Sequence, residues 1–245
     1  MLYVTGDLHG DADELLLRCR PLAPGDALIV CGDLGLLWRG TRRERLRLDW
    51  LNAKLRCPVL FVDGNHENFD LLEQYPVSAW KGGLVHRIRP RLLHLMRGQV
   101  FDVAGRTIFT MGGASSHDMP DGVLNPRDPD FARRRRELDA RGGRYRIRRV
   151  SWWPQELPRP RELAAGLRSL QRQDWRVDII VTHCLPTTIQ QSFGADFYAP
   201  DRLTDYLDTV RRRCEFGRWY CGHYHHERIY AGRFQVLYQS VVPLL

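Results

Sequence analysis

The sequence predicts an α/β protein built around a parallel β-sheet. Three continuous apolar runs occur in the first third of the chain, and a stretch with helical periodicity follows each of them. The runs are apolar throughout instead of alternating, which is typical of strands whose two faces are both buried. A chain of 245 residues, 43% hydrophobic and 27% charged, is long enough for one large domain with a substantial core.

The first third divides into three strand–loop–helix units. Each strand-like run ends in a polar loop, and the three runs are "LYVTGDLHG", "ALIVCGDLG" and "VLFVDGNHE". The helices predicted to follow them span residues 11–20, 41–55 and 67–74. Strands that alternate with helices in this way favour βαβ units.

The rest of the chain is less regular. Residues 84–112 are short apolar runs interrupted by glycine, which favours antiparallel strands or hairpins. Residues 114–160 are polar and rich in Arg, Gly and Pro, and they indicate an excursion from the core. After it we expect a helix at 160–173, a strand at 177–184, a helix at 201–213, a strand at 218–225 and a terminal hairpin at 228–244. Because we find no internal repeat and no second core, we expect a single domain over residues 1–245.

Composition favours a cytoplasmic protein. The six cysteines form no CxxC pair and several lie in apolar runs, so we expect reduced, buried thiols. We see no signal peptide and no apolar run long enough to cross a bilayer, so no membrane partner is expected. The net charge of +8 is carried almost entirely by arginine, since Lys54 and Lys81 are the only lysines. This bias permits a polyanionic substrate but also fits genome composition, which has no functional meaning.

Polar residues recur where the predicted strands end. They are Asp7, His9, Asp33, Asn65, His66, His183, His223 and His225. Because strand ends on one edge of an open α/β sheet form the ligand crevice, we expect these side chains to converge. Carboxylates, imidazoles and an amide are ligands that suit Mn, Fe, Zn or Ni. In "GDLHG" and "GHYH" the paired residues stand two apart, which would point both to one side of an extended strand end.

Each of these residues also has a simpler interpretation when taken alone. Asp7 and Asp33 are ordinary turn or helix-capping residues, and Asn65 suits a left-handed turn. A lone histidine such as His183 is more often a hydrogen-bonded core residue than a ligand. The metal-site hypothesis therefore depends on the whole set.

Five blocks in order carry a resemblance to a known family. "GDLHG", "CGDLG", "GNHE", "THC" and "GHYH" together resemble the calcineurin-like metallophosphoesterase superfamily, over residues 5–226. The resemblance implies a two-sheet β-sandwich flanked by helices, in α/β/β/α layers. In that arrangement the terminal hairpin and residues 84–112 would build the second sheet.

The resemblance also implies a dinuclear metal centre and a hydrolase of phosphoester bonds, either a phosphatase or a phosphodiesterase. Asp33 would bridge two divalent ions, expected to be Mn, with Fe, Zn or Ni as alternatives. The first ion would also take Asp7, His9 and His225, and the second Asn65, His183 and His223. A metal-bound hydroxide would attack phosphorus, and His66 would assist beside the leaving-group oxygen. Glu67 would begin the next helix.

One block departs from the branch of this family that contains Ser/Thr protein phosphatases. That branch carries an Asp and an Arg in its second block, where this sequence has Leu36 and Leu37. Arg39 is a candidate substitute as a phosphate clamp, or else an exposed residue at a helix start. Monoester and diester chemistry therefore both stay open.

Two further segments are candidates for substrate contact. In "GGASSHDM", Ser116 and His117 are expected to contact substrate or to brace a metal ligand, or simply to form a turn. Between Arg133 and Arg149 lie nine arginines, with Trp152 and Trp153 close behind. This segment is either a lid or groove wall for a phosphate chain, or a solvated helix and hairpin with its tryptophans packed on the core edge.

The expected substrate is a phosphorylated small molecule, a nucleotide or dinucleotide, a nucleic-acid end or a phosphoprotein. The alternative to an enzyme is a catalytically weak nucleotide- or nucleic-acid-binding protein on the same fold. It would bind nucleic acid tightly, with a steep dependence on salt and no need for metal.

Overall fold

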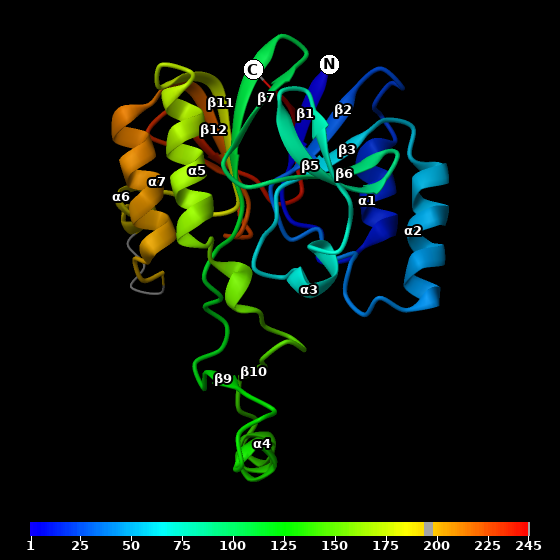
Figure 1. The fold of residues 1–245 in the computed structure, drawn as a ribbon, viewed down its shortest axis with the longest axis vertical. Coiled ribbons are helices and arrows are strands. Elements are labelled where there is room, and N and C mark those ends of the chain that lie inside the picture. Colours follow the sequence, from blue (N-terminus) through cyan, green and yellow to red (C-terminus); the bar gives the residue numbers. More distant parts are fainter. Residues whose placement is uncertain (194–197, 245) are drawn as a thin grey trace.

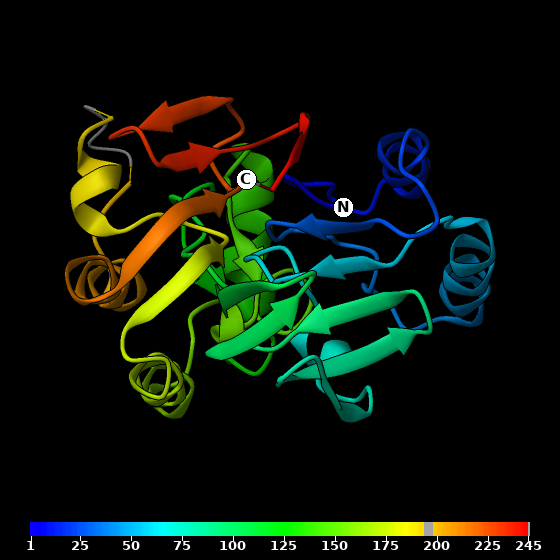
Figure 2. The same ribbon diagram turned by 90° about the horizontal axis from the view of Figure 1, so that it is seen from above.

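Two β-sheets pack face to face, with helices on the outer face of each. The structure is a computed structural model, and it describes residues 1–193 and 198–244. Figure 2 shows the layers from above, with the sheets in the middle and a group of helices on either side. This is the α/β/β/α arrangement, so the predicted fold class is confirmed.

The first sheet has seven strands and contains the three βαβ units predicted from the first third of the chain. In spatial order its strands are β15 (Val241–Pro243), β1 (Leu2–Thr5), β2 (Ala27–Val30), β3 (Val59–Phe61), β6 (Leu92–Leu95), β5 (Gly83–Arg89) and β4 (Val77–Trp80). Strands β1, β2, β3 and β6 are parallel, while β15, β5 and β4 pair antiparallel to their neighbours.

The second sheet has six strands, and its centre is again parallel. In spatial order these are β13 (Arg228–Tyr230), β14 (Phe234–Val236), β12 (Glu215–Cys221), β11 (Arg176–Thr182), β8 (Arg106–Met111) and β7 (Gln99–Val103). Strands β14, β12, β11 and β8 are parallel, and an antiparallel hairpin partner closes each edge. The carboxyl ends of β8, β11 and β12 therefore lie together at one edge.

Several helices begin at side chains that cap their free amide groups. Asp11 accepts hydrogen bonds from the first turn of α1 (Ala12–Cys19), and Thr41 does the same for α2 (Arg42–Lys54). These two helices cover the first sheet, next to the short α3 (Phe69–Leu72). The second sheet is covered by α5 (Pro160–Gln171), α6 (Thr187–Gln191) and α7 (Arg202–Arg213).

Side-chain alternation along the strands builds three apolar layers. In β2, Leu28 and Val30 face α1 and α2, whereas Ile29 lies in the layer between the sheets. In β11, Ile180 faces the helices of the second sheet and Ile179 joins Ile29 in the middle layer. Because a strand presents successive residues to opposite faces, central strands are apolar on both, as the continuous runs predicted.

A long arm leaves the body at the edge where the parallel strands end. Figure 1 shows it projecting away from the two sheets, with β9 (Val123–Leu124) and β10 (Arg146–Ile147) along it and α4 (Phe131–Ala140) at its tip. The arm corresponds to the predicted excursion. It returns to the body through a 3₁₀ helix, Pro154–Glu156.

Three details of the predicted fold are wrong. Residues 84–95 form β5 and β6 in the first sheet, because β6 pairs directly with β3, and only β7 and β8 reach the second. The terminal segment is also divided, because β15 pairs with β1, which would otherwise be an unpaired edge. The helix predicted at 67–74 is limited to α3, which Asn68 caps.

Candidate metal centre

The predicted ligands come together at the carboxyl ends of five strands. Asp7 and His9 follow β1, Asp33 follows β2, Asn65 and His66 follow β3, His183 follows β11, and His223 and His225 follow β12. The two sheets contribute to one site because their carboxyl edges meet in the middle of the sandwich. The structure therefore brings all eight residues together, although their chemical roles stay predictions.

Asp7, His9 and His225 form the first group of ligand atoms. His225 Nε2 lies 3.1 Å from Asp7 Oδ2 and 3.0 Å from His9 Nε2. His9 Nε2 is also 3.6 Å from Asp7 Oδ2. Three lone-pair donors that point at one another across such short distances have the arrangement expected of ligands around a cation.

Asp33, Asn65 and His183 form the second group. His183 Nε2 lies 3.4 Å from Asp33 Oδ1 and 3.2 Å from Asn65 Oδ1. The other ring nitrogen of His183 is 2.7 Å from the carbonyl oxygen of Cys31. A proton on Nδ1 that is donated to this carbonyl leaves Nε2 free to bind metal, a common arrangement for histidine ligands.

Asp33 lies between the two groups. Its Oδ2 is 3.7 Å from His9 Nδ1, while its Oδ1 faces His183. His223 completes the second group, with its ring centroid 5.0 Å from that of His183. A carboxylate with one oxygen toward each group is placed as the predicted bridging ligand would be.

Four of the predicted ligands lie on left-handed backbone. The φ angles are 47° at His9, 48° at Asp33, 70° at His223 and 51° at His225. The prediction that ligands two residues apart share one face of an extended strand end is therefore wrong. Tight loops turn the side chains inward instead, and such backbone is costly for residues with a Cβ, which is why it concentrates at functional sites.

Two motif glycines let neighbouring ligands approach the backbone. A Cβ at Gly64 would lie 2.0 Å from Asp33 Oδ1, and a Cβ at Gly222 would lie 2.1 Å from Asp7 Oδ1. Both carboxylates then accept a hydrogen bond from the next turn of chain: His66 N donates to Asp33 at 2.8 Å and His223 N donates to Asp7 at 3.0 Å. The glycine in "GNHE" and "GHYH" is thus explained by close packing between blocks.

Burial and mutual charge perturb the ionisable groups. Burial alone would raise the pKa of Asp33, but the charge and hydrogen bond of His183 outweigh it and hold the pKa well below its usual range. Burial acts to lower the pKa of His183, yet Asp33 and Asp7 raise it to about 9. Burial also holds the pKa of His223 well below its usual value. Two buried carboxylates surrounded by imidazoles attract positive charge, so the donor set fits divalent cations.

His66 lies beside the ligands. Its ring centroid is 5.2 Å from that of His9, and it groups with His9 and Asp33. It also lines a cavity of about 70 Å³ that Asp33, Asn65, His223 and His225 share. The side chain is thus in reach of a group bound at the ligands, as the predicted role in catalysis requires.

A hydrogen-bond chain holds the Asn65 amide in one orientation. Asn65 Nδ2 donates to Ser116 Oγ at 3.2 Å, and Ser116 Oγ donates to Glu156 Oε2 at 2.6 Å. Because the amide nitrogen is engaged in this way, Asn65 Oδ1 faces His183 and the ligand group. Ser116, predicted to contact substrate or to brace a metal ligand, thus has the contacts that the second alternative requires. Glu156 was missed because nothing in its local sequence distinguishes it.

Glu67 does not begin a helix, so this prediction is wrong. Its side chain is only 1% exposed, and Oε1 accepts hydrogen bonds from the amides of Leu34 at 2.9 Å and Gly35 at 3.4 Å. Burial, followed by the charge of Asp33, raises the pKa of Glu67 well above its usual value. Glu67 therefore fixes the loop that carries Asp33.

The second block differs from the protein phosphatase pattern in structure as well as in sequence. Leu36 and Leu37 are buried in the layer between α1, α2 and the first sheet, so they belong to the core. Arg39 is exposed and, within residues 1–193 and 198–244, lines neither of the cavities that the ligand histidines line. The structure does not bring the predicted phosphate clamp into the site.

His117 does join the site. It lines both the small cavity at the ligands and a larger neighbouring one, and its ring centroid is 5.0 Å from that of His223. Burial lowers the pKa of His117. Its position fits the predicted substrate contact.

A buried polar network surrounds Asp63, two residues before Asn65 in the same loop. His94 Nε2 lies 3.0 Å from Asp63 Oδ1, Arg97 Nε donates to Asp63 Oδ2 at 2.8 Å, and His86 stacks on His94. Nothing next to His86 and His94 in the sequence indicates this network. Asp63, the common partner of His94 and Arg97, lies at the end of the strand run "VLFVDG", and that position is the only local signal.

The arm has more features of a solvated surface than of a lid. Of the nine arginines between Arg133 and Arg149, five form ion pairs with nearby carboxylates: Arg133, Arg135, Arg141, Arg146 and Arg149. Trp153 is 1% exposed and packs in the core, so it is not available for stacking on a base. Figure 1 shows α4 at the far tip of the arm, away from the strand ends.

Two general features lie outside the site. All six cysteines are buried and free. In the described ranges, every helix is too short or too polar to span a bilayer.

Comparison with known proteins identifies the family. The model of the calcineurin-like phosphoesterase family matches residues 1–227. A search of curated proteins found no match to the chain. The chain therefore belongs to the calcineurin-like phosphoesterase family, and this membership indicates phosphoester hydrolysis at a metal centre.

Proposed function

We propose that this protein hydrolyses phosphoester bonds with two divalent metal ions, Mn²⁺ being the expected species and Fe, Zn or Ni the alternatives. The observation that carries the proposal is the convergence of two carboxylates, one amide oxygen and four imidazoles from five separate loops. Asp7, His9 and His225 would hold the first ion, and Asn65, His183 and His223 the second. Asp33, whose two oxygens face the two groups, would contact both.

When bound, such ions would lower the pKa of a water molecule and offset the charge of the phosphoryl oxygens. The residues themselves hold the ligand atoms in place. The Cys31 carbonyl fixes the His183 ring, the amides of His66 and His223 fix the two aspartates, and Ser116 fixes Asn65. Most ligands are buried, so few water molecules compete for the same positions.

His66 is proposed to give a proton to the oxygen of the leaving group. Its backbone is tied to Asp33, and its ring borders the small cavity at the ligands. A proton donor in this position typically accelerates hydrolysis by ~10²–10⁴-fold. We therefore expect His66→Gln to lose about that factor in kcat and to retain metal.

The substrates proposed are phosphorylated small molecules or nucleotides, in the cytoplasm. Free, buried cysteines fit a reducing compartment. The ion pairs along the arm and the burial of Trp153 favour neither a phosphate-binding lid nor nucleic-acid binding.

The test is hydrolysis of p-nitrophenyl phosphate and of bis-p-nitrophenyl phosphate, with Mn²⁺ and with chelator. Wild type is compared with Asp33→Ala and with Asp102→Ala, a control at an exposed position on β7. We expect turnover that needs both metal and Asp33, while Asp102→Ala matches wild type. The ester that is preferred separates phosphatase from phosphodiesterase. Turnover that persists in strong chelator, or in Asp33→Ala, would contradict the mechanism.

A further inference from the structure

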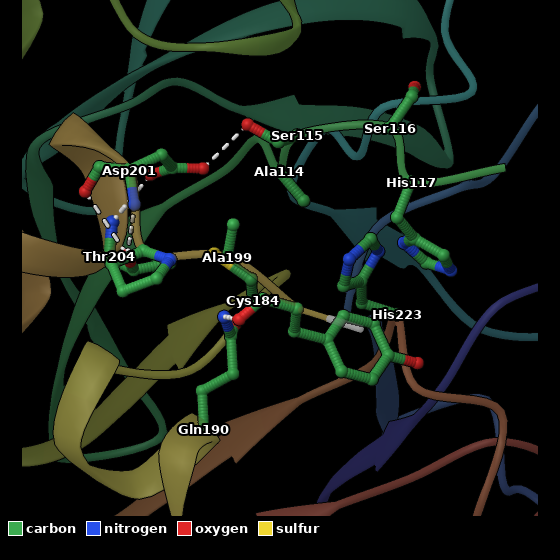
Figure 3. Close-up of a pocket in the computed structure, with 12 residues that line it drawn as sticks. Ala114, Ser115, Ser116, His117, Cys184, Gln190, Ala199, Asp201, Thr204 and His223 are labelled. Atoms are coloured by element: carbon green, nitrogen blue, oxygen red, sulfur yellow. Dashed lines mark hydrogen bonds between the residues drawn. The ribbon is translucent and has the colours of Figure 1, made fainter. Parts of the chain in front are cut away.

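A second cavity, of about 270 Å³, opens beside the ligands and is called the side cavity below. His117 and His223 line both the side cavity and the smaller one at the ligands, so the two adjoin. Figure 3 shows these two histidines at one end of the side cavity and Asp201 and Thr204 at the other. A group attached to a phosphoryl bound at the ligands would extend into this space.

Within residues 1–193 and 198–244, no Lys or Arg side chain lines the side cavity. This is unusual in a chain with 37 lysines and arginines. The polar groups at the far end are instead hydroxyls and the carboxylate of Asp201. A second phosphate placed here would meet a like charge with no cation to offset it, which is strongly unfavourable.

The Asp201 carboxylate is held in position and can accept a further hydrogen bond. Oδ1 accepts from the amides of Leu203 at 2.7 Å and Thr204 at 2.9 Å, at the start of α7. Oδ2 accepts from Ser115 Oγ at 2.6 Å, as the dashed line in Figure 3 marks. Because a carboxylate oxygen has two lone-pair positions, Oδ2 has room for one more donor. A hydroxyl group of a bound molecule can supply that donor, and the Ser115 hydroxyl oxygen next to it is a second acceptor.

The middle of the side cavity suits a ring. Ala114, Cys184 and Ala199 lie between the two polar ends, and Figure 3 shows them there. The ring of Tyr198 also lines the cavity, with its centroid 4.8 Å from that of His117. A volume near 270 Å³ is slightly below that of drug-sized pockets, so it holds one small organic group and not a folded segment of protein.

We propose that the side cavity receives the leaving group of the ester, and that this group is uncharged and carries hydroxyls, as a sugar or a nucleoside does. The proposal rests on the proposed function and narrows its substrate class to phosphoesters of such alcohols. In the reaction, the bond from phosphorus to the leaving oxygen breaks and a bond from phosphorus to a water oxygen forms. The leaving oxygen takes up a proton, and the alcohol and phosphate are released.

The first arm of the test compares kcat/KM for a nucleoside 5′-monophosphate, a hexose phosphate, pyrophosphate, a phosphoserine peptide and p-nitrophenyl phosphate. The variant is Asp201→Asn, which removes the charge and keeps a good helix cap. Asp205→Asn is the matched control, because it makes the same change one turn later in α7, outside the lining. We expect wild type to prefer the nucleotide or the sugar phosphate over pyrophosphate and the peptide by at least about tenfold.

The variants then report on the contact itself. Relative to p-nitrophenyl phosphate, Asp201→Asn should lower kcat/KM for the preferred hydroxylated substrate by about 10- to 100-fold, the usual effect of losing a charge-assisted hydrogen bond. Asp205→Asn should leave that ratio as in wild type. Equal ratios in the two variants, or a preference for pyrophosphate or the peptide, would overturn the proposal.

The second arm measures binding without turnover. Saturation-transfer NMR with free adenosine and free glucose reports directly on the side cavity and separates a nucleoside from a sugar. Transfer to at least one of them in wild type, weakened in Asp201→Asn, supports the proposal. If wild type hydrolyses no ester even with metal, the proposed function fails by itself. The absence of transfer to both alcohols would then refute the side cavity as their site.

Discussion

Replacing Ser116 by Ala should weaken metal binding although Ser116 is not a ligand. The hydroxyl accepts from Asn65 Nδ2 at 3.2 Å because its own proton is donated to Glu156 at 2.6 Å. Without the hydroxyl, the amide nitrogen of Asn65 loses its acceptor, and the amide can rotate so that Oδ1 no longer faces His183. Asn65 is 6% exposed and Glu156 is 5% exposed, so water replaces the lost contacts poorly.

The expected magnitude follows from these contacts. A lost partner of a metal ligand typically costs 10- to 100-fold in metal affinity, or about 1.4 to 2.7 kcal/mol. The Asn65–Ser116 distance is long for a hydrogen bond, so we expect the lower half of that range. The assay is calorimetric titration of the metal-free protein with Mn²⁺.

Ser115→Ala is the matched control for this prediction. It deletes the same group from the adjacent residue, whose hydroxyl bonds to Asp201 instead of Asn65. A third variant, Glu156→Gln, keeps the shape of the side chain but can donate to Ser116 Oγ, so it should weaken metal binding as well. The reasoning is refuted if Ser116→Ala, correctly folded by circular dichroism, binds Mn²⁺ as tightly as Ser115→Ala does.

Three other predictions concern the site and its support. Gly64→Ala places a Cβ 2.0 Å from Asp33 Oδ1 and should abolish metal-dependent turnover, whereas Gly25→Ala, at a position with open space around it, should not. Equal activity of the two variants in a p-nitrophenyl phosphate assay would contradict the packing argument. Burial, followed by the charge of His94, lowers the pKa of His86 to about 4 from an ordinary 6.5, so the neutral form stabilises the fold above pH 6.5 and that stability is lost as the pH falls toward 4. Between pH 7 and pH 5 this amounts to about 2 kcal/mol, so in urea unfolding with chelator the wild type should lose about 2 kcal/mol more than His86→Gln does. An equal loss in the two proteins would rule the prediction out. When free metal is at 100 times Kd, adding chelator should lower the free energy of unfolding of wild type by about 2.7 kcal/mol and should leave that of Asp33→Ala almost unchanged. If chelator does not change the thermal melt of wild type, the site holds no stabilising metal.

The local pattern of the chain was sufficient for the elements that make up the site. Apolar runs followed by amphipathic stretches located β1, β2 and β3 and the helices α1 and α2. The loops after these strands then had to meet at one edge, because parallel strands end on the same side. For this reason the ligand residues could be named from sequence, including His183, which stands far from the other blocks.

The local pattern failed where the outcome depended on a distant partner. β5 and β6 joined the first sheet because β3 offered a pairing edge, and nothing in residues 84–95 indicates which sheet they enter. The direction of the ligand side chains was also missed. It depends on left-handed turns at residues such as His9 and His225. This backbone conformation costs free energy, and it persists only because the surrounding loops, packed around one point, hold it in place.

By itself, the sequence determined which candidate ligand atoms this protein has and predicted that they lie at one edge of the sandwich. Motif spacing and strand periodicity are local, and they survive in the sequence as readable patterns. Only the tertiary structure decided what orients those atoms and what lies beside them. Ser116 is 51 residues from Asn65 and 40 from Glu156, and the side cavity is formed where the loop after β8 meets the start of α7. Such contacts produce no periodic pattern in the sequence, because the packing of distant segments specifies them.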